Sequence, residues 1–176
     1  METLAWVYFY ASAFVVVVIL SAAARHKVRF SVDFIGALTG YRLLPEGVLI
    51  IWWVVPTLEA LAVAQILFSY GQSRWLAAAL FTLYGAAIAT NLLRGRQHID
   101  CGCGGEGTPI SWGLVLRNAV LLLIALPLST PDGGFTIIMG FLVVLTGALG
   151  LLAYASSIKC LLMLRGSGRR LCLKTC

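Results

Sequence analysis

The chain has 176 residues, of which 60% are apolar and only 11% are charged, and its formal net charge is +6. A water-soluble domain of this size does not need so much apolar surface, so the composition excludes an ordinary soluble enzyme. Uninterrupted apolar runs recur along the sequence, and in a bilayer such runs satisfy their backbone hydrogen bonds as helices. The predicted fold is therefore all-α, a polytopic membrane helical bundle. No nucleic-acid motif accompanies the positive charge, which we assign to anionic lipid headgroups.

The first apolar run, residues 4–24, contains no charged side chain and is long enough as a helix to cross a hydrocarbon core of about 30 Å. No basic stretch precedes this run, and Arg25, Lys27 and Arg29 follow it. This arrangement predicts a retained membrane anchor rather than a cleaved signal peptide. Hydropathy then falls over residues 31–45, which predicts a short interfacial helix or a re-entrant stretch rather than a full crossing.

Four further apolar runs predict spanning helices at residues 47–70, 76–93, 109–128 and 135–158. Thr108 and Ser111 compete as the N-cap of the helix expected at 109–128. With five crossings in all, the two termini lie on opposite sides of the membrane. We expect one integral membrane domain, residues 1–158, followed by a basic cytoplasmic tail, residues 159–176.

Basic side chains in the expected loops concentrate on one side of the predicted bundle, whereas Arg74 alone lies on the other side. Because cytoplasmic loops of membrane proteins are enriched in Lys and Arg, we predict that the basic side is the cytoplasm. The N-terminus then lies outside and the C-terminus lies in the cytoplasm. The side chains that define the basic side are Arg25, Lys27, Arg29, Arg42, Arg94, Arg96, Lys159, Arg165, Arg169, Arg170 and Lys174.

The run from Asp100 to Gly105, DCGCGG, places two thiols one residue apart in a glycine-rich loop between spanning segments. A disulfide across so short a spacing closes a small, strained ring, and strained disulfides are easier to reduce. Glycine between and after the cysteines leaves room for the sulfur of a partner to approach in line. These features favour a redox site with Cys101 and Cys103 as the catalytic residues.

Some of the neighbouring charges are expected to lower the pKa of these thiols, and others are expected to raise it. Arg94, Arg96 and a protonated His98 would stabilise a thiolate, whereas Asp100 beside Cys101 would oppose it. Two other interpretations stay open. The cysteines could brace a compact structural loop, or they could bind a metal together with His98 and Asp100, although the spacing differs from the C-x-x-C of zinc knuckles. We assign no catalytic role to the other cysteines, Cys160, Cys172 and Cys176.

Two charged residues lie inside the expected spanning segments. Glu59 is near the middle of its apolar run, and Arg117 lies early in a later run. Each is costly in lipid unless it is paired or hydrated, so we expect the two to pair with each other; snorkelling of Arg117 towards the headgroups is the alternative. We predict that Glu59, Arg117 and Asn118 line a polar cleft beneath Cys101 and Cys103.

Four polar elements stand out among the apolar runs: Pro56-x-x-Glu59, Arg94-Gly-Arg96, the run from Asp100 to Gly105, and Arg117-Asn118. Together they closely resemble the MauE family of methylamine utilisation membrane proteins, which is itself similar to the broader DoxX-like membrane group. The resemblance implies a multi-pass protein of the bacterial inner membrane that serves methylamine degradation. In that role it would support the processing, transport or maturation of the small, disulfide-rich beta subunit of methylamine dehydrogenase.

The resemblance also implies two protein partners, a thioredoxin-like MauD-type protein and the dehydrogenase beta subunit as the client. On this interpretation Cys101 and Cys103 exchange electrons with the thioredoxin-like partner, so that the cysteines of the client pair correctly. The chain would then be a membrane thiol–disulfide oxidoreductase. The tryptophylquinone cofactor belongs to the client, and we expect no cofactor in this chain.

The predicted cytoplasmic position of Cys101 and Cys103 conflicts with a client that matures outside the cell membrane. Either the loop folds back between the helices and is reached from the periplasm through a cavity, or the chain carries electrons across the bilayer through a further redox group. We favour the fold-back. The alternative function is a non-enzymatic membrane scaffold for assembly or export, in which the cysteines only brace the loop.

Overall fold

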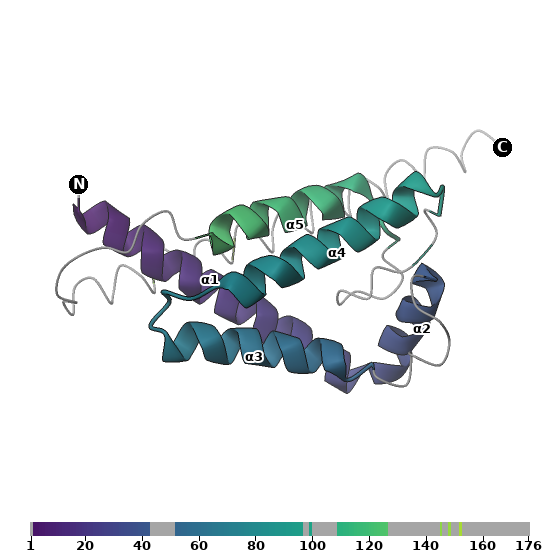
Figure 1. Cartoon of the computed structure of the whole chain (residues 1–176), viewed down its shortest axis with the longest axis horizontal. Helices are drawn as coiled ribbons and strands as arrows, with labels where there is room; N and C mark the ends of the chain where they lie inside the picture. Colours follow the sequence, from purple (N-terminus) through teal and green to yellow (C-terminus); the bar gives the residue numbers. More distant parts are fainter. Residues whose placement is uncertain are drawn as a thin grey trace.

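A computed structural model of the chain describes residues 2–42, 52–96, 99, 109–126, 145, 148 and 152. Its regular elements are helices (Figure 1), which confirms the predicted all-α class. In chain order they are α1 Glu2–Arg29, α2 Ser31–Tyr41, α3 Val54–Phe68, α4 Trp75–Leu93 and α5 Trp112–Ala125. The number of membrane crossings and their orientation stay predictions.

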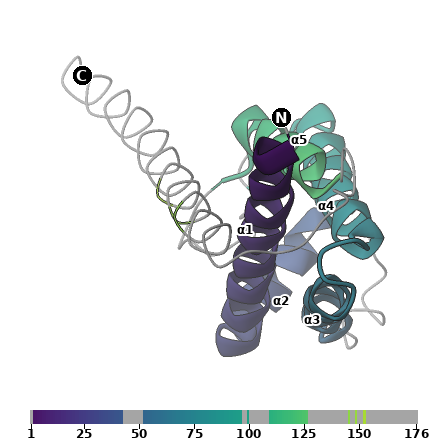
Figure 2. The ribbon, with the colours of Figure 1, turned by 90° about the vertical axis from the view of Figure 1, so that its left-hand side faces the viewer.

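The described helices form a bundle in which α1 packs on α3 and α4 packs on α5, with further contacts from α3 to α4 and from α1 to α5. Figures 1 and 2 show the same arrangement from two directions, with α2 at the end of α1 that lies away from the N-terminus. Many residues at the centre of the bundle are small, and small residues let the backbones of membrane helices approach closely. The buried alanines of this core are Ala13, Ala62, Ala77, Ala78 and Ala125.

Helix α1 continues to Arg29, whereas the sequence analysis ended it where the apolar run ends. The extra turn carries basic side chains, which interact favourably with the C-terminal end of the helix dipole. A short bend at Phe30 then leads into α2, and the N–H of Phe34 donates to the carbonyl of Phe30 at 3.0 Å. The short helix expected after the first apolar run is confirmed, although it ends at Tyr41 rather than at residue 45.

Helix α3 begins at Val54, so Pro56 lies in its first turn. A proline there removes no helical hydrogen bond, because the first N–H groups of a helix have no acceptor within it. Within the helix expected over 47–70, the described helix α3 runs from Val54 to Phe68, and Glu59 lies near its beginning. Residues 43–51 lie outside the described part of the chain.

Helix α4 matches the run expected at 76–93 and ends in a Schellman turn. The N–H of Arg96 donates to the carbonyl of Asn91 at 3.0 Å, and the N–H of Gly95 donates to that of Leu92 at 3.0 Å. Gly95 adopts a φ of 73°, which suits glycine because it has no Cβ. The Arg-Gly-Arg element thus turns the chain at the end of α4.

Helix α5 begins at Trp112, with Ser111 in the extended conformation of an N-cap residue. Ser111 occupies the N-cap position, although its side chain makes no capping hydrogen bond, and Thr108 lies outside the described residues. The last expected span, 135–158, is described at only three positions, Leu145, Ala148 and Leu152, all of them helical.

The outer surface of the bundle is apolar. Exposed leucines occur on every long helix, and examples are Leu4, Leu61, Leu83, Leu116 and Leu123. Two helices, α1 and α4, are long and apolar enough to cross a membrane, whereas α3 and α5 are shorter apolar helices. A surface of this kind is expected where lipid replaces water as the solvent. The fold is consistent with a helical membrane protein.

Candidate functional site

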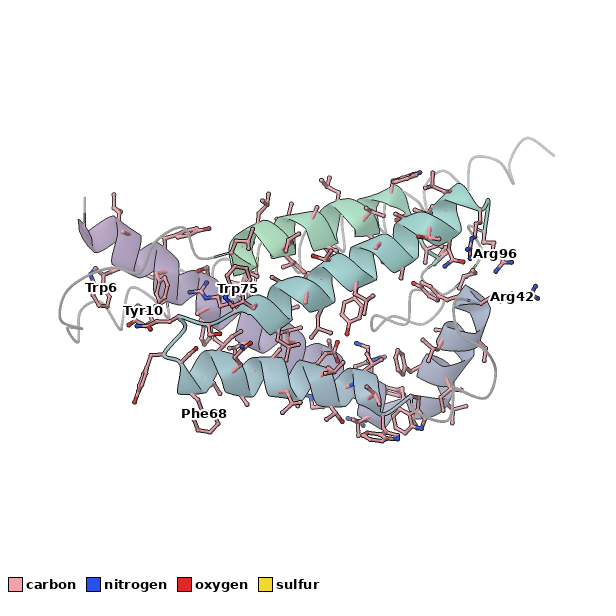
Figure 3. The ribbon with its side chains drawn as sticks, viewed as in Figure 1. Trp6, Tyr10, Arg42, Phe68, Trp75 and Arg96 are labelled. Atoms are coloured by element: carbon pink, nitrogen blue, oxygen red, sulfur yellow. The ribbon has the colours of Figure 1, made fainter. Side chains whose placement is uncertain are left out.

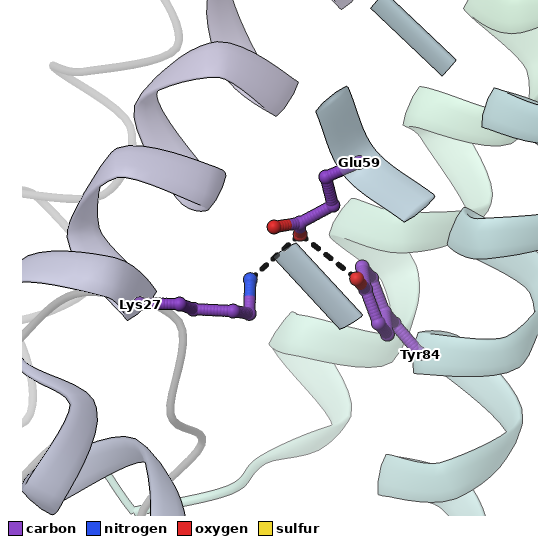
Figure 4. Close-up of polar contacts among 3 residues, drawn as sticks. All are labelled: Lys27, Glu59 and Tyr84. Atoms are coloured by element: carbon purple, nitrogen blue, oxygen red, sulfur yellow. Dashed lines mark hydrogen bonds and ion pairs between the residues drawn. The ribbon is translucent and has the colours of Figure 1, made fainter. Parts of the chain in front are cut away.

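A buried ion pair joins the helices in the lower half of the bundle as drawn in Figure 1. The carboxylate of Glu59 on α3 has an exposed fraction of 0%, and Nζ of Lys27 on α1 donates to its Oε1 at 2.6 Å. The hydroxyl of Tyr84 on α4 donates to the same oxygen at 2.8 Å (Figure 4). We call Lys27, Glu59 and Tyr84 the charge cluster.

Aromatic rings complete the surroundings of the buried ammonium group. Nζ of Lys27 lies 5.6 Å from the ring centroid of Phe34 on α2 and 5.4 Å from that of Tyr84. Rings at such distances stabilise a desolvated cation through their quadrupoles. The charge cluster and Phe34 therefore tie α1, α2, α3 and α4 together around one buried carboxylate.

The partner of Glu59 differs from the one expected. The sequence analysis paired Glu59 with Arg117, but the structure pairs it with Lys27. The reason is the antiparallel packing of α1 on α3, which brings the end of α1 opposite the beginning of α3. The sequence offered no signal for this pairing, because it depends on how α1 aligns with α3.

Asn118 belongs to a neighbouring contact between α4 and α5. Its side chain is buried, its Nδ2 donates to the carbonyl of Leu114 at 2.8 Å, and a Cβ at Gly85 would lie 3.5 Å from its own Cβ. Glu59 is hydrogen-bonded to Tyr84, and Asn118 lies beside Gly85, the next residue of α4. The two polar side chains therefore meet α4 at adjacent residues. Arg117 precedes Asn118 on α5 and is half-buried. The polar cleft predicted from Glu59, Arg117 and Asn118 stays a prediction.

The predicted thiol site falls on residues that the structure does not describe: His98, Asp100, Cys101 and Cys103. We call residues 100–108 the dithiol segment, and the residues that flank it are described. The N–H of Ile110 donates to the carbonyl of Ile99 at 2.9 Å. This hydrogen bond brings the residues before and after the dithiol segment together and thereby closes the base of the segment.

The base of the dithiol segment is anchored in a small apolar cluster. Ile110 is fully buried with Tyr41 of α2 and with Ile88 and Leu92 of α4, and Ile99 packs against this group. In a membrane helical bundle such side chains stabilise the contact through close packing. The position at which the segment starts is therefore set by contacts with α2 and α4.

Chain geometry limits how far the two thiols can lie from this anchor. At about 3.5 Å per residue, the Cα of Cys101 lies within about 7 Å of that of Ile99, and the Cα of Cys103 within about 14 Å. Helix α4 has 19 residues and is therefore about 28 Å long. The anchor itself, Ile99 with Ile110, packs beside Ile88 and Leu92 in the part of the bundle where α4 ends.

The end of the bundle at which α4 ends carries positive charge. Figure 3 shows Arg42 and Arg96 at one end of the molecule and Trp6, Tyr10 and Trp75 towards the other. Arg96 is half-buried, and its Nη1 is buried without a hydrogen-bond partner among the described residues. An unpaired guanidinium donor near a cysteine stabilises the thiolate.

At the opposite end of the bundle, Arg74 is a buried cation that the sequence analysis treated as a residue of an outer loop. Its exposed fraction is 1%. Nε donates to the carbonyl of Gly71, Nη1 to Oγ of Ser12 and Nη2 to the carbonyl of Phe9, each at 2.7 Å. Burial lowers the pKa of Arg74 from its ordinary value, and the neighbouring Tyr8 raises it. Arg74 fastens the α3–α4 turn to α1.

A metal centre was one of the interpretations open from the sequence. Among the residues that the structure describes, no group of three or more His, Cys, Asp or Glu side chains could hold a metal ion. The ligand set considered for the dithiol segment includes His98, Asp100 and the two cysteines, which are not among those residues. The metal interpretation of that segment is therefore untested.

Comparison with known proteins gives a consistent result. Residues 1–131 match the family model described as methylamine utilisation protein MauE. The chain is 41% identical over 114 residues to the methylamine utilization protein MauE of Paracoccus denitrificans, covering 62% of this chain and 61% of that protein. It is 37% identical over 158 residues to the MauE protein of Methylorubrum extorquens, covering 81% of each chain. No solved structure matches the chain.

Proposed function

The chain belongs to the MauE family of methylamine utilisation proteins, and from that premise we propose that it matures a periplasmic client by thiol–disulfide exchange. The client is the beta subunit of methylamine dehydrogenase, and the partner in exchange is a thioredoxin-like protein of the MauD type. The protein acts in the bacterial inner membrane, which it crosses five times. Cys101 and Cys103 are the reacting residues.

The exchange chemistry needs only thiols and disulfides. A thiolate of one partner attacks the Cys101–Cys103 disulfide, forms a mixed disulfide and releases the other cysteine as a thiolate. The second thiolate of that partner then attacks the mixed disulfide. The partner leaves as a disulfide, and the chain retains the two electrons and, on protonation, a pair of thiols. A second partner restores the disulfide by the reverse sequence.

One observation carries this proposal, the hydrogen bond between Ile99 and Ile110 that closes the base of the dithiol segment. It supports a loop that offers the two thiols to a partner protein, because the ends of the loop are held together at one anchored point. Arg94 and Arg96 precede the segment in the sequence, and positive charges near a cysteine favour the thiolate. Both conditions speed exchange, since the attacking species is the thiolate.

The hydrogen bond between Ile99 and Ile110 also bears on whether the thiols are accessible from the cytoplasm or from the periplasm. If the end that carries Arg42 and Arg96 faces the cytoplasm, the thiols are reached from the periplasm only if the dithiol segment folds back between the helices. Labelling of Cys103 with an impermeant thiol reagent in intact cells tests this, and labelling only after permeabilisation argues against periplasmic access.

The proposal is tested by replacing the two reacting sulfurs. Cys101→Ser and Cys103→Ser each abolish formation of the mature beta subunit while insertion of the protein is normal, and Cys160→Ser serves as the matched control. One of the two variants also traps a mixed disulfide with the thioredoxin-like protein, which mass spectrometry identifies. Unaffected maturation in both variants supports the alternative function, a non-enzymatic scaffold for assembly or export.

A further inference from the structure

Three arginines come together at the end of the bundle where α2 and α4 both end. Arg42 is the C-cap residue of α2, Arg94 is the C-cap residue of α4, and Arg96 follows two residues later. The last residue of α2, Tyr41, is buried with Leu92 of α4, so the ends of the two helices are adjacent. Figure 3 shows Arg42 and Arg96 at this end. We call Arg42, Arg94 and Arg96 the arginine cluster.

The positive charges of the arginine cluster are not compensated within the described ranges of the chain. The ion pair found there joins Lys27 and Glu59, and no member of the arginine cluster forms one. Asp33, the acid of α2, lies in the first turn of that helix, whereas Arg42 is at its other end. Nη1 of Arg96 is buried without a hydrogen-bond partner. A buried charged donor without an acceptor is unfavourable, which indicates an acceptor from outside the described residues.

An ordinary role at the helix ends does not account for this atom. Basic side chains near the C-terminus of a helix often bind its last carbonyls and interact favourably with its dipole. Here backbone groups serve those carbonyls: the N–H of Arg42 donates to the carbonyl of Thr39 at 3.2 Å, and the N–H of Arg96 donates to that of Asn91 at 3.0 Å. The buried Nη1 of Arg96 still lacks an acceptor.

Arg42 also adopts a backbone conformation that arginine does not favour. Its φ is 46° and its ψ is 36°, in the left-handed region. Glycine is common at this place after a helix, because it has no Cβ to clash there. Strained residues of this kind occur where a ligand or partner contact compensates for the strain. The position therefore favours a contact made by the side chain of Arg42.

We propose that the arginine cluster binds the phosphate group of one anionic phospholipid molecule. Guanidinium groups bind phosphate oxygens through paired, charge-assisted hydrogen bonds, and basic pockets between membrane helices bind lipid headgroups. Leu93, directly before Arg94, is 77% exposed and offers an apolar contact to an acyl chain, which a free phosphate ion does not need. This site is independent of the proposed function.

The test uses the full-length protein in detergent, titrated with phosphatidylglycerol and followed by native mass spectrometry, which gives the dissociation constant of the first bound lipid. Arg96→Gln weakens this binding about tenfold, because a hydrogen bond to a charged group is lost. Arg42→Gln and Arg94→Gln each weaken it about fivefold. Arg25→Gln, at an exposed arginine of α1, is the matched control and changes it less than twofold. An equal loss in Arg25→Gln indicates diffuse attraction to the positive charge and overturns the inference.

Two further probes identify the ligand. Phosphatidylethanolamine, whose headgroup is zwitterionic, binds about tenfold more weakly than phosphatidylglycerol, because its ammonium group is repelled by the arginine cluster. Inorganic phosphate in excess does not displace phosphatidylglycerol, because it lacks the acyl chains. Equal affinity for the two lipids, or displacement of phosphatidylglycerol by inorganic phosphate, overturns the inference.

A glycine at residue 42 separates lipid binding from folding. Glycine suits a φ of 46°, so without added lipid Arg42→Gly unfolds at the same temperature as the original protein or at a higher one. Added phosphatidylglycerol raises the unfolding temperature of the original protein more than that of Arg42→Gly, because a ligand stabilises the folded state in proportion to its affinity. An equal rise in the two proteins overturns the inference.

Discussion

Two cations that are buried in the described part of the chain, Arg74 and Lys27, are held in different ways. Arg74 donates to two carbonyls and a hydroxyl, and its guanidinium carbon lies 4.5 Å from the ring centroid of Phe9. Lys27 pairs with a fully buried carboxylate. The planar fork of arginine suits several neutral acceptors at once, while the compact charge of lysine suits one carboxylate. One end of the bundle is therefore held by hydrogen bonds and the other by a compensated pair of charges.

The largest effect is expected from breaking the pair of charges. Glu59→Gln leaves Lys27 buried without its counter-ion, and loss of one partner from a buried pair costs about 3–5 kcal/mol. The measurement is the free energy of unfolding of detergent-solubilised protein, followed by circular dichroism during denaturation. Asp33→Asn is the matched control, because Asp33 is an exposed acid on α2 and its replacement has no measurable effect.

A double variant at Lys27 and Glu59 shows whether the two side chains act as an ion pair or only through packing. In the double variant Lys27→Met and Glu59→Gln neither charge remains, so its unfolding free energy lies above that of Glu59→Gln alone. Additive losses in the double variant would contradict the role given to the charge cluster. They would indicate that each side chain contributes only through its own volume.

A smaller loss is expected at the other end of the bundle. Arg74→Lys keeps the positive charge but replaces a fork that serves three acceptors with a single ammonium group. The carbonyl of Phe9 keeps the hydroxyl of Ser12 as a donor, and the lysine ammonium can serve one further acceptor, so the loss is that of one unsatisfied acceptor, about 1–3 kcal/mol. Arg94→Lys, at an exposed position, is the control in the same denaturation assay. Equal stability of the two variants would mean that Arg74 contributes only its charge.

These two cations also show what could and could not be predicted from the sequence. Apolar runs predicted the helices, because burial and lipid contact depend on local composition. The need of Glu59 for a partner was predicted as well, since an uncompensated charge is costly in lipid. The identity of the partner was not, because it depends on how α1 and α3 align. A hydropathy profile contains no information on that alignment, so Lys27 and Arg74 were both assigned to loops.

A substitution at Gly95, in the turn after α4, is expected to have an intermediate effect on the stability. Gly95→Ala places a Cβ on a residue with a φ of 73°, which costs about 1 kcal/mol or more. It also strains the turn that leads to the dithiol segment, so the alkylation rate of Cys101 changes together with the stability. Gly36→Ala, where φ is helical and the added Cβ meets nothing, lowers neither.

The smallest effect is expected from the hydroxyl of Tyr84, and it separates the two parts of the charge cluster. Tyr84→Phe removes the hydrogen bond to Oε1 of Glu59 but keeps the ring beside Nζ of Lys27, so the loss is about 1 kcal/mol. Tyr70→Phe, at an exposed tyrosine, has no measurable effect. Tyr84→Leu removes the ring as well and costs more than Tyr84→Phe, because the desolvated ammonium loses an aromatic neighbour. If the phenylalanine and leucine variants were equally stable, the ring of Tyr84 would have no energetic role beside Lys27, and only the carboxylate and the ring of Phe34 would hold the ammonium group.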